Sequence, residues 1–117
     1  MKKVLWLDDI RNPFESRWDK YISDHINGSV LVEWVKSYGE FVRKITTDSL
    51  PDYIFFDHDL GTGKSGMGCM KFLVSYIQDN DLDPNDVTVL FQTSNPVGRE
   101  NMESLYNSYK NYYRAQN

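Results

Sequence analysis

The sequence predicts a single α/β domain, residues 1–117, in which a parallel sheet lies between layers of helices. Two observations support this prediction. Short apolar segments alternate four times with amphipathic segments, which is typical of a chain of βα units. Two of the apolar segments run directly into carboxylates, at 8–9 and at 57–59. Functional side chains in such folds collect at the carboxyl ends of the strands.

The first half of the chain predicts two βα units. Residues 3–7, KVLWL, are apolar on both faces, as expected of a strand buried between helices. Asn12-Pro13 marks a turn, and large apolar residues recur about once per turn over 14–26, which predicts a helix. A strand rich in β-branched residues follows at 29–35, and then a helix at 39–47. We expect the tryptophans and phenylalanines to lie in the core.

The second half repeats the pattern around a glycine-rich loop. Its predicted elements are a strand at 53–56, a helix at 66–78, a polar turn at 79–86, a strand at 87–91 and a helix at 99–114. Right-handed crossovers give a flavodoxin-like strand order 2-1-3-4, truncated after the fourth βα unit. In that order strands 1 and 3 are neighbours.

Composition narrows the function classes. The net charge is −4, which argues against a protein that coats nucleic acid but leaves room for one nucleotide or RNA end held locally. The single cysteine, Cys69, cannot form an internal disulfide, which fits a reducing cytoplasm. The apolar run after residue 3 is too short for a signal peptide, and no stretch approaches a membrane span. We therefore expect a cytoplasmic protein.

Carboxylates are the main candidates for a site. The strand order places Asp8 and Asp9 beside Asp57 and Asp59, and such a cluster repels itself unless a cation or protons offset the charge. Hard carboxylate oxygens are ligands for Mg²⁺ or Mn²⁺. We therefore expect a metal site at Asp8, Asp9 and Asp57. The alternative is that these aspartates are helix caps and solvated turn residues.

His58 is the candidate acid/base, with Asp57 and Asp59 as its catalytic partners, because imidazole titrates near neutral pH. All three can face the site only if the strand has ended at 57, since side chains alternate along a strand. The alternative roles for His58 are a hydrogen-bonded loop residue or a metal ligand.

Four residues are candidates for phosphate binding. The GTGKS segment lacks the first glycine of a P-loop, but Lys64 and the following helix start could still hold a phosphate. Arg11 and Arg99 lie next to strand ends, and Asn95 could orient a substrate oxygen. The alternatives are solvated surface cations and, for Asn95, a helix cap.

At LWLDDIRNP (5–13), FFDHDLG (55–61) and SNPVGRENM (94–102) the chain resembles the cyclic-phosphate processing receiver-like family, a relative of two-component receivers found often in phages and bacteria. The resemblance implies a receiver-like fold, a divalent metal, action on cyclic phosphates of RNA ends or nucleotides, and roles for Asp8, Asp9, Asp57, His58, Asp59 and Asn95; Arg11 and Gly98 also match. Gln92 and Thr93 stand where the family pattern has a histidine and a serine. If that histidine is a second acid/base, the departure implies weakened or lost activity here.

Three hypotheses follow from these residues. The first is a metal-dependent phosphoesterase-like domain that processes cyclic phosphates. The second is a degenerate receiver that takes phosphate on Asp57, with Thr93 as the switch hydroxyl, or only binds a partner. It ranks lower because the chain has no room for a receiver's fifth strand and its lysine. The third is a sponge that binds a cyclic nucleotide without cleaving it.

Overall fold

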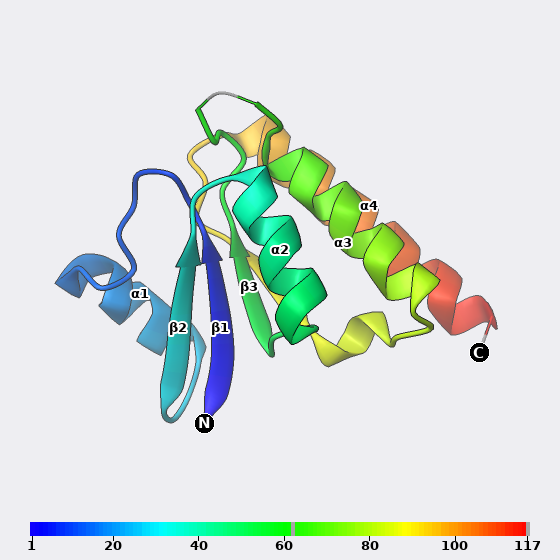
Figure 1. The fold of residues 1–117 in the computed structure, drawn as a ribbon, viewed down its shortest axis with the longest axis horizontal. Helices are drawn as coiled ribbons and strands as arrows, with labels where there is room; N and C mark the ends of the chain where they lie inside the picture. Colours follow the sequence, from blue (N-terminus) through cyan, green and yellow to red (C-terminus); the bar gives the residue numbers. More distant parts are fainter. Residues whose placement is uncertain (62, 117) are drawn as a thin grey trace.

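The computed structural model describes residues 1–61 and 63–116 and contains a four-stranded parallel sheet with the order β2-β1-β3-β4 (Figure 1). The strands are β1 (Lys2–Leu7), β2 (Val30–Val35), β3 (Tyr53–Phe56) and β4 (Thr88–Phe91). Leu7 is in register with Val35 on one side and with Phe56 on the other. The predicted strand order is confirmed, and β1 and β3 end side by side.

The helices cover the two faces of the sheet unequally. The helices are α1 (Ser16–His25), α2 (Tyr38–Asp48), α3 (Gly66–Asp79) and α4 (Pro96–Gln116), with a short 3₁₀ helix, η1 (Pro84–Asp86). Figure 1 shows α1 alone behind the sheet, whereas α2 and α3 lie on the opposite face and α4 packs along α3. None of the described helices is long and apolar enough to cross a membrane.

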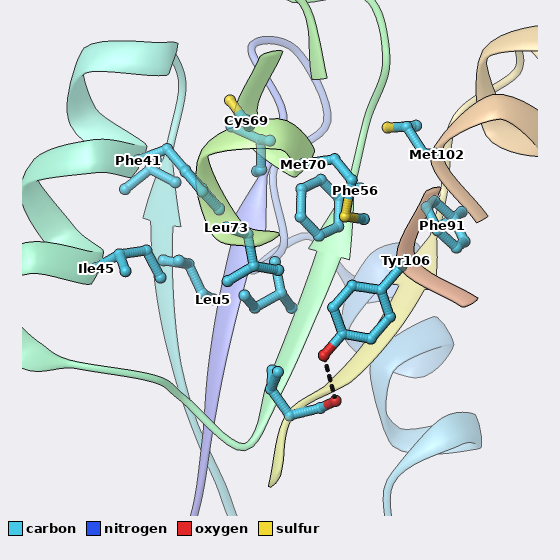
Figure 2. Close-up of a cluster of buried hydrophobic side chains, with 14 of the residues drawn as sticks. Leu5, Phe41, Ile45, Phe56, Cys69, Met70, Leu73, Phe91, Met102 and Tyr106 are labelled. Atoms are coloured by element: carbon cyan, nitrogen blue, oxygen red, sulfur yellow. Dashed lines mark hydrogen bonds between the residues drawn. The ribbon is translucent and has the colours of Figure 1, made fainter. Parts of the chain in front are cut away.

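Strand alternation divides the core into two clusters. Leu5 and Phe56 point toward α2 and α3, and Trp6 and Phe55 point toward α1. Figure 2 shows the larger cluster, which includes Tyr106. The hydroxyl of Tyr106 lies within hydrogen-bond distance of two backbone carbonyl oxygens, those of Pro84 and Val87. Burial of each large apolar side chain contributes about 1.5–3 kcal/mol. These two cores fix the ends of β1 and β3 relative to each other.

The first helix begins later than the sequence predicts. The backbone N–H of Phe14 donates to the side-chain oxygen of Asn12 at 2.8 Å, so an Asx turn holds this segment outside the helix. Phe14 is 63% exposed, and the prediction that it belongs to the core is wrong. The last helix begins three residues earlier than predicted, at Pro96, because Asn95 caps it through a hydrogen bond from Gly98 N–H at 2.9 Å.

Candidate metal and phosphate site

Three carboxylates meet where β1 and β3 end. Asp8, Asp9 and Asp57 each offer an oxygen, and these oxygens lie within 4.8 Å of one another. Asp8 is fully buried and Asp57 is 4% exposed. The N–H of Asp57 donates to the carbonyl of Leu7 at 3.0 Å, so the pairing of β1 with β3 itself positions the cluster.

The loop after β1 folds around the carboxylate of Asp8. Its Oδ1 accepts hydrogen bonds from the backbone N–H groups of Ile10 and Arg11, at 3.0 and 2.9 Å. Its Oδ2 lies 3.4 Å from the side-chain amide nitrogen of Gln92, which also donates to the carbonyl of Leu7 at 2.9 Å. Sequence reasoning missed this role of Gln92, although its place directly after β4 was a signal. Asp8 is thus held from both sides.

Arg11 supplies a positive charge to the cluster. Its Nη1 lies 3.1 Å from Asp8 Oδ2 and 3.5 Å from Asp57 Oδ1. Its Nη2 lies 3.4 Å from Ser94 Oγ, and the guanidinium lies 5.6 Å from the ring centre of Trp18. The sequence predicts Arg11 as a phosphate ligand, whereas in the structure its guanidinium pairs with carboxylates. This pairing offsets part of their repulsion.

Arg11 does not fully compensate the negative charge of the three carboxylates. Burial, and then the charge of Asp8, raise the pKa of Asp57, against the opposing effects of a hydrogen bond from Thr93, the Arg11 charge and the His58 backbone N–H. The Oδ1 atom of Asp9 is buried and has no hydrogen-bond partner in the described chain. An orphaned buried oxygen and a destabilised carboxylate fit a divalent cation, which takes hard oxygen ligands. The residues present therefore suit Mg²⁺ or Mn²⁺.

The ring of His58 is held by its neighbour in the loop after β3 and by the residue that caps α4. Its Nδ1 lies 3.0 Å from Asp59 Oδ1, and the side-chain amide nitrogen of Asn95 lies 3.3 Å from Nδ1 and 3.4 Å from Asp59 Oδ2. A carboxylate only accepts, so Nδ1 carries a proton toward Asp59 and the neutral ring keeps its lone pair on Nε2. β3 ends at Phe56, before the three polar residues.

A glycine lets α3 approach the site. The N–H of Gly66 donates to the carbonyl of His58 at 2.7 Å, and a Cβ at this position would fall 1.9 Å from the carbonyl oxygen of Asp57. No other residue type fits without moving the backbone. The glycine-rich loop was the sequence signal for this contact, but its spacing did not identify Gly66.

Two predicted phosphate ligands lie apart from the carboxylates. The ammonium of Lys64 lies 4.6 Å from the ring centre of Tyr38, and Arg99 Nε lies 3.2 Å from Glu103 Oε1. Within residues 1–61 and 63–116, neither cation forms an ion pair with the acidic cluster. Of the predicted cations, the structure brings only Arg11 to it.

Comparison with known proteins gives a family and a fold. The family described as Cyclic-phosphate processing Receiver domain matches residues 3–108. Six chains of solved structures match. One is titled as the yeast Spc42 trimeric coiled coil, amino acids 181–211, fused to another structure, with 25% identity and a TM-score of 0.58. The match covers 88% of this chain and 61% of that one. No curated protein matches.

Proposed function

Because the chain belongs to the family of cyclic-phosphate processing receiver domains, we propose that it is a metal-dependent phosphoesterase that opens cyclic phosphates of RNA ends or nucleotides. One observation carries the proposal. Three carboxylate oxygens lie within 4.8 Å of one another, and the acid/base candidate His58 directly follows one of them, Asp57. This arrangement offers cation ligands and a proton carrier at one edge of the sheet.

In this proposal Asp8, Asp9 and Asp57 hold the cation. A bound Mg²⁺ or Mn²⁺ supplies Lewis-acid polarisation of the phosphoryl oxygen. His58 takes a proton from the attacking water at Nε2, while the Asp59 carboxylate accepts a hydrogen bond from Nδ1–H at 3.0 Å and stabilises the imidazolium. Water adds to phosphorus, one ring P–O bond breaks, and the proton ends on the released ribose oxygen.

Asn95 and Arg11 orient the reactants. The side-chain oxygen of Asn95 accepts from Gly98 N–H, so its amide nitrogen is directed toward His58 and Asp59. Arg11 is 24% exposed at its side chain, and its planar guanidinium can pair with a phosphate as it does with a carboxylate. Phosphate binding by Arg11 therefore stays compatible with its place among the carboxylates.

A turnover assay tests the proposal. Chelator-treated protein is supplied with Mg²⁺ or Mn²⁺ and a panel of 2′,3′-cyclic phosphates, from mononucleotides to RNA ends, and products are identified. We expect ring opening that His58→Ala lowers by about 10²–10⁴-fold, the usual contribution of a general acid/base, with metal binding retained. Asp57→Ala should abolish both ring opening and metal binding.

The matched control is Asp24→Ala, which removes an exposed carboxylate paired with Lys20. Turnover in the His58 variant equal to that of the control would remove His58 from the mechanism. Ligand-induced stabilisation without any turnover would make the protein a binder of cyclic nucleotides rather than an enzyme.

A second candidate is phosphate transfer to Asp57, as in receivers. The observation that favours it is that the Thr93 side chain lies close enough to the Asp57 carboxyl to lower the pKa of that group, which puts a hydroxyl beside a carboxylate in the acidic cluster. Acetyl phosphate with Mg²⁺ should then add one phosphoryl group to the wild type and none to Asp57→Asn, as read by intact mass. An unmodified wild type would count against this candidate.

A further inference from the structure

We propose that the groove between α2 and α3 binds single-stranded RNA, and that the substrate of the acidic site is therefore the end of an oligoribonucleotide rather than a free nucleotide. The proposal rests on the proposed function for the reacting end of the substrate. It adds a second binding surface that the catalytic cluster does not include.

The groove is an open depression of about 580 Å³. Its walls come from the first residue of α2, from the end of the glycine-rich loop and from one face of α3, and its polar and aromatic lining residues are Tyr38, Lys64, Ser65, Lys71, Phe72 and Ser75. From Ser65 to Ser75 the helix rises about 15 Å, which is long enough to follow an extended strand. Figure 1 shows the first turns of α2 and α3 side by side.

The charge of the groove is opposite to that of the molecule. The chain carries a net charge of −4, yet the described lining residues include two lysines and no carboxylate. Neither Lys64 nor Lys71 forms an ion pair within the described chain, although Arg11, Lys20, Lys44 and Arg99 do. Two ammonium groups in a depression, neither paired with a carboxylate of the described chain, favour a polyanion over a neutral or cationic partner.

The remaining groups of the groove suit nucleotides. The rings of Tyr38 and Phe72 are partly exposed, and their centroids lie 6.4 Å apart at 80°. The Lys64 ammonium lies 4.6 Å from the ring centre of Tyr38, so a base can stack on Phe72 directly, and on Tyr38 when Lys64 moves to a phosphate. Ser65 precedes α3 but makes no side-chain capping bond. Its hydroxyl is available to a phosphate or a ribose 2′-OH, the group that distinguishes RNA from DNA.

The groove adjoins the proposed reaction site through the start of α3. Ser65 lines the groove, and the next residue, Gly66, donates its N–H to the carbonyl of His58 at 2.7 Å. The first turn of α3 therefore has the groove on one side and the backbone of Asp57 and His58 on the other. A chain whose cyclic end reaches His58 can continue over Ser65 and Lys64 into the groove.

Binding of a non-reacting probe tests the groove on its own. The probe is a fluorescent hexaribonucleotide with a 3′-hydroxyl end, titrated by anisotropy in Mg²⁺ against wild type, Lys64→Gln/Lys71→Gln and the charge-matched control Lys2→Gln/Lys20→Gln, whose lysines are exposed elsewhere. We expect the groove variant to lose about tenfold in affinity. Its slope of log K against log salt should fall by about 1.4, since each phosphate contact on a single strand contributes about 0.7. The control should match wild type.

Steady-state kinetics and a change of the probe from RNA to DNA complete the test. KM for an oligoribonucleotide with a cyclic end should rise in the groove variant, whereas KM for the cyclic mononucleotide should not change. Equal binding by groove variant and control would overturn the proposal. Equal binding of a fluorescent hexadeoxyribonucleotide of the same base sequence would overturn the choice of RNA. If the probe binds through Lys64 and Lys71 but no cyclic phosphate is turned over, the proposed hydrolysis is refuted and RNA binding by the groove is supported.

Discussion

The ring of His58 lies directly against the backbone of Gly98 in the first turn of α4. A Cβ at Gly98 would fall 2.4 Å from His58 Cγ and 2.5 Å from Cδ2, closer than any ordinary contact. The same turn places Asn95 against His58 and Asp59. The last helix, which is distant in sequence, therefore sets the position of the proposed acid/base.

Gly98→Ala tests this contact. Alanine in a helix is favoured over glycine by about 1 kcal/mol, but here the added methyl must displace the His58 ring, and overpacking costs about 1–3 kcal/mol. We expect a net loss of stability and a fall in turnover of about 10²-fold. The control is Gly39→Ala in α2, where the Cβ meets only Arg43 Nη1 at 3.8 Å and should stabilise the protein. A Gly98 variant that behaved like the control would contradict the contact.

Asp59→Asn tests the orientation of the histidine. The hydrogen bond from His58 lowers the pKa of Asp59, against a smaller effect of burial, so the carboxylate is ionised when it contacts the ring. The amide keeps the shape but removes the charge that stabilises an imidazolium. We expect kcat to fall about 10–100-fold, toward the lower end of the contribution of general acid/base catalysis, with KM nearly unchanged. A change in KM alone would point to substrate binding instead.

Asp57→Asn tests whether the ionised Asp57 carboxylate destabilises the metal-free protein. Burial and the Asp8 charge raise the pKa of Asp57, so the stability that this carboxyl contributes is present below its unfolded pKa and is lost as pH rises through the raised folded value. The neutral amide does not titrate. In chelator at neutral pH the variant should therefore be more stable than wild type, with a Tm about 4 °C higher for a gain of about 1 kcal/mol.

The same comparison has two internal checks. In acid, where the wild-type carboxyl is protonated, the difference in Tm should vanish. Added Mg²⁺ should stabilise the wild type and leave the variant unchanged, because ligand binding to the folded state raises its stability. A variant less stable than wild type in chelator at neutral pH would contradict the conclusion that the ionised Asp57 carboxylate destabilises the fold.

Arg11→Gln tests whether the Arg11 guanidinium competes with Mg²⁺ for the carboxylates. Removing the guanidinium leaves Asp8 and Asp57 without the charge that lies 3.1 and 3.5 Å away. We expect metal-free stability to fall and Mg²⁺ affinity to rise about tenfold, equivalent to about 1.4 kcal/mol, as measured by calorimetry. Arg17→Gln is the control, since Arg17 also lies over Trp18, at 4.9 Å. Unchanged Mg²⁺ affinity in the Arg11 variant would show that the guanidinium does not compete with the metal.

Much of the architecture follows from local pattern. The alternation of strands and helices predicts the elements within a few residues, and the right-handedness of βα crossovers predicts the order β2-β1-β3-β4 that the structure contains. The order puts Asp8 next to Asp57, because parallel strands end at the same edge. The neighbourhood of the carboxylates was therefore available from the sequence.

Only the tertiary structure decided where the long side chains go. Arg11 lies among the carboxylates, Lys64 lies over Tyr38, and Arg99 pairs with Glu103, although all three follow strand ends or helix starts and look equivalent in sequence. The contact between His58 and Gly98 joins residues 40 positions apart. Periodicity encodes which face of an element is buried, but the partner of a flexible side chain depends on how separate elements pack against one another, and that packing is set by the whole core.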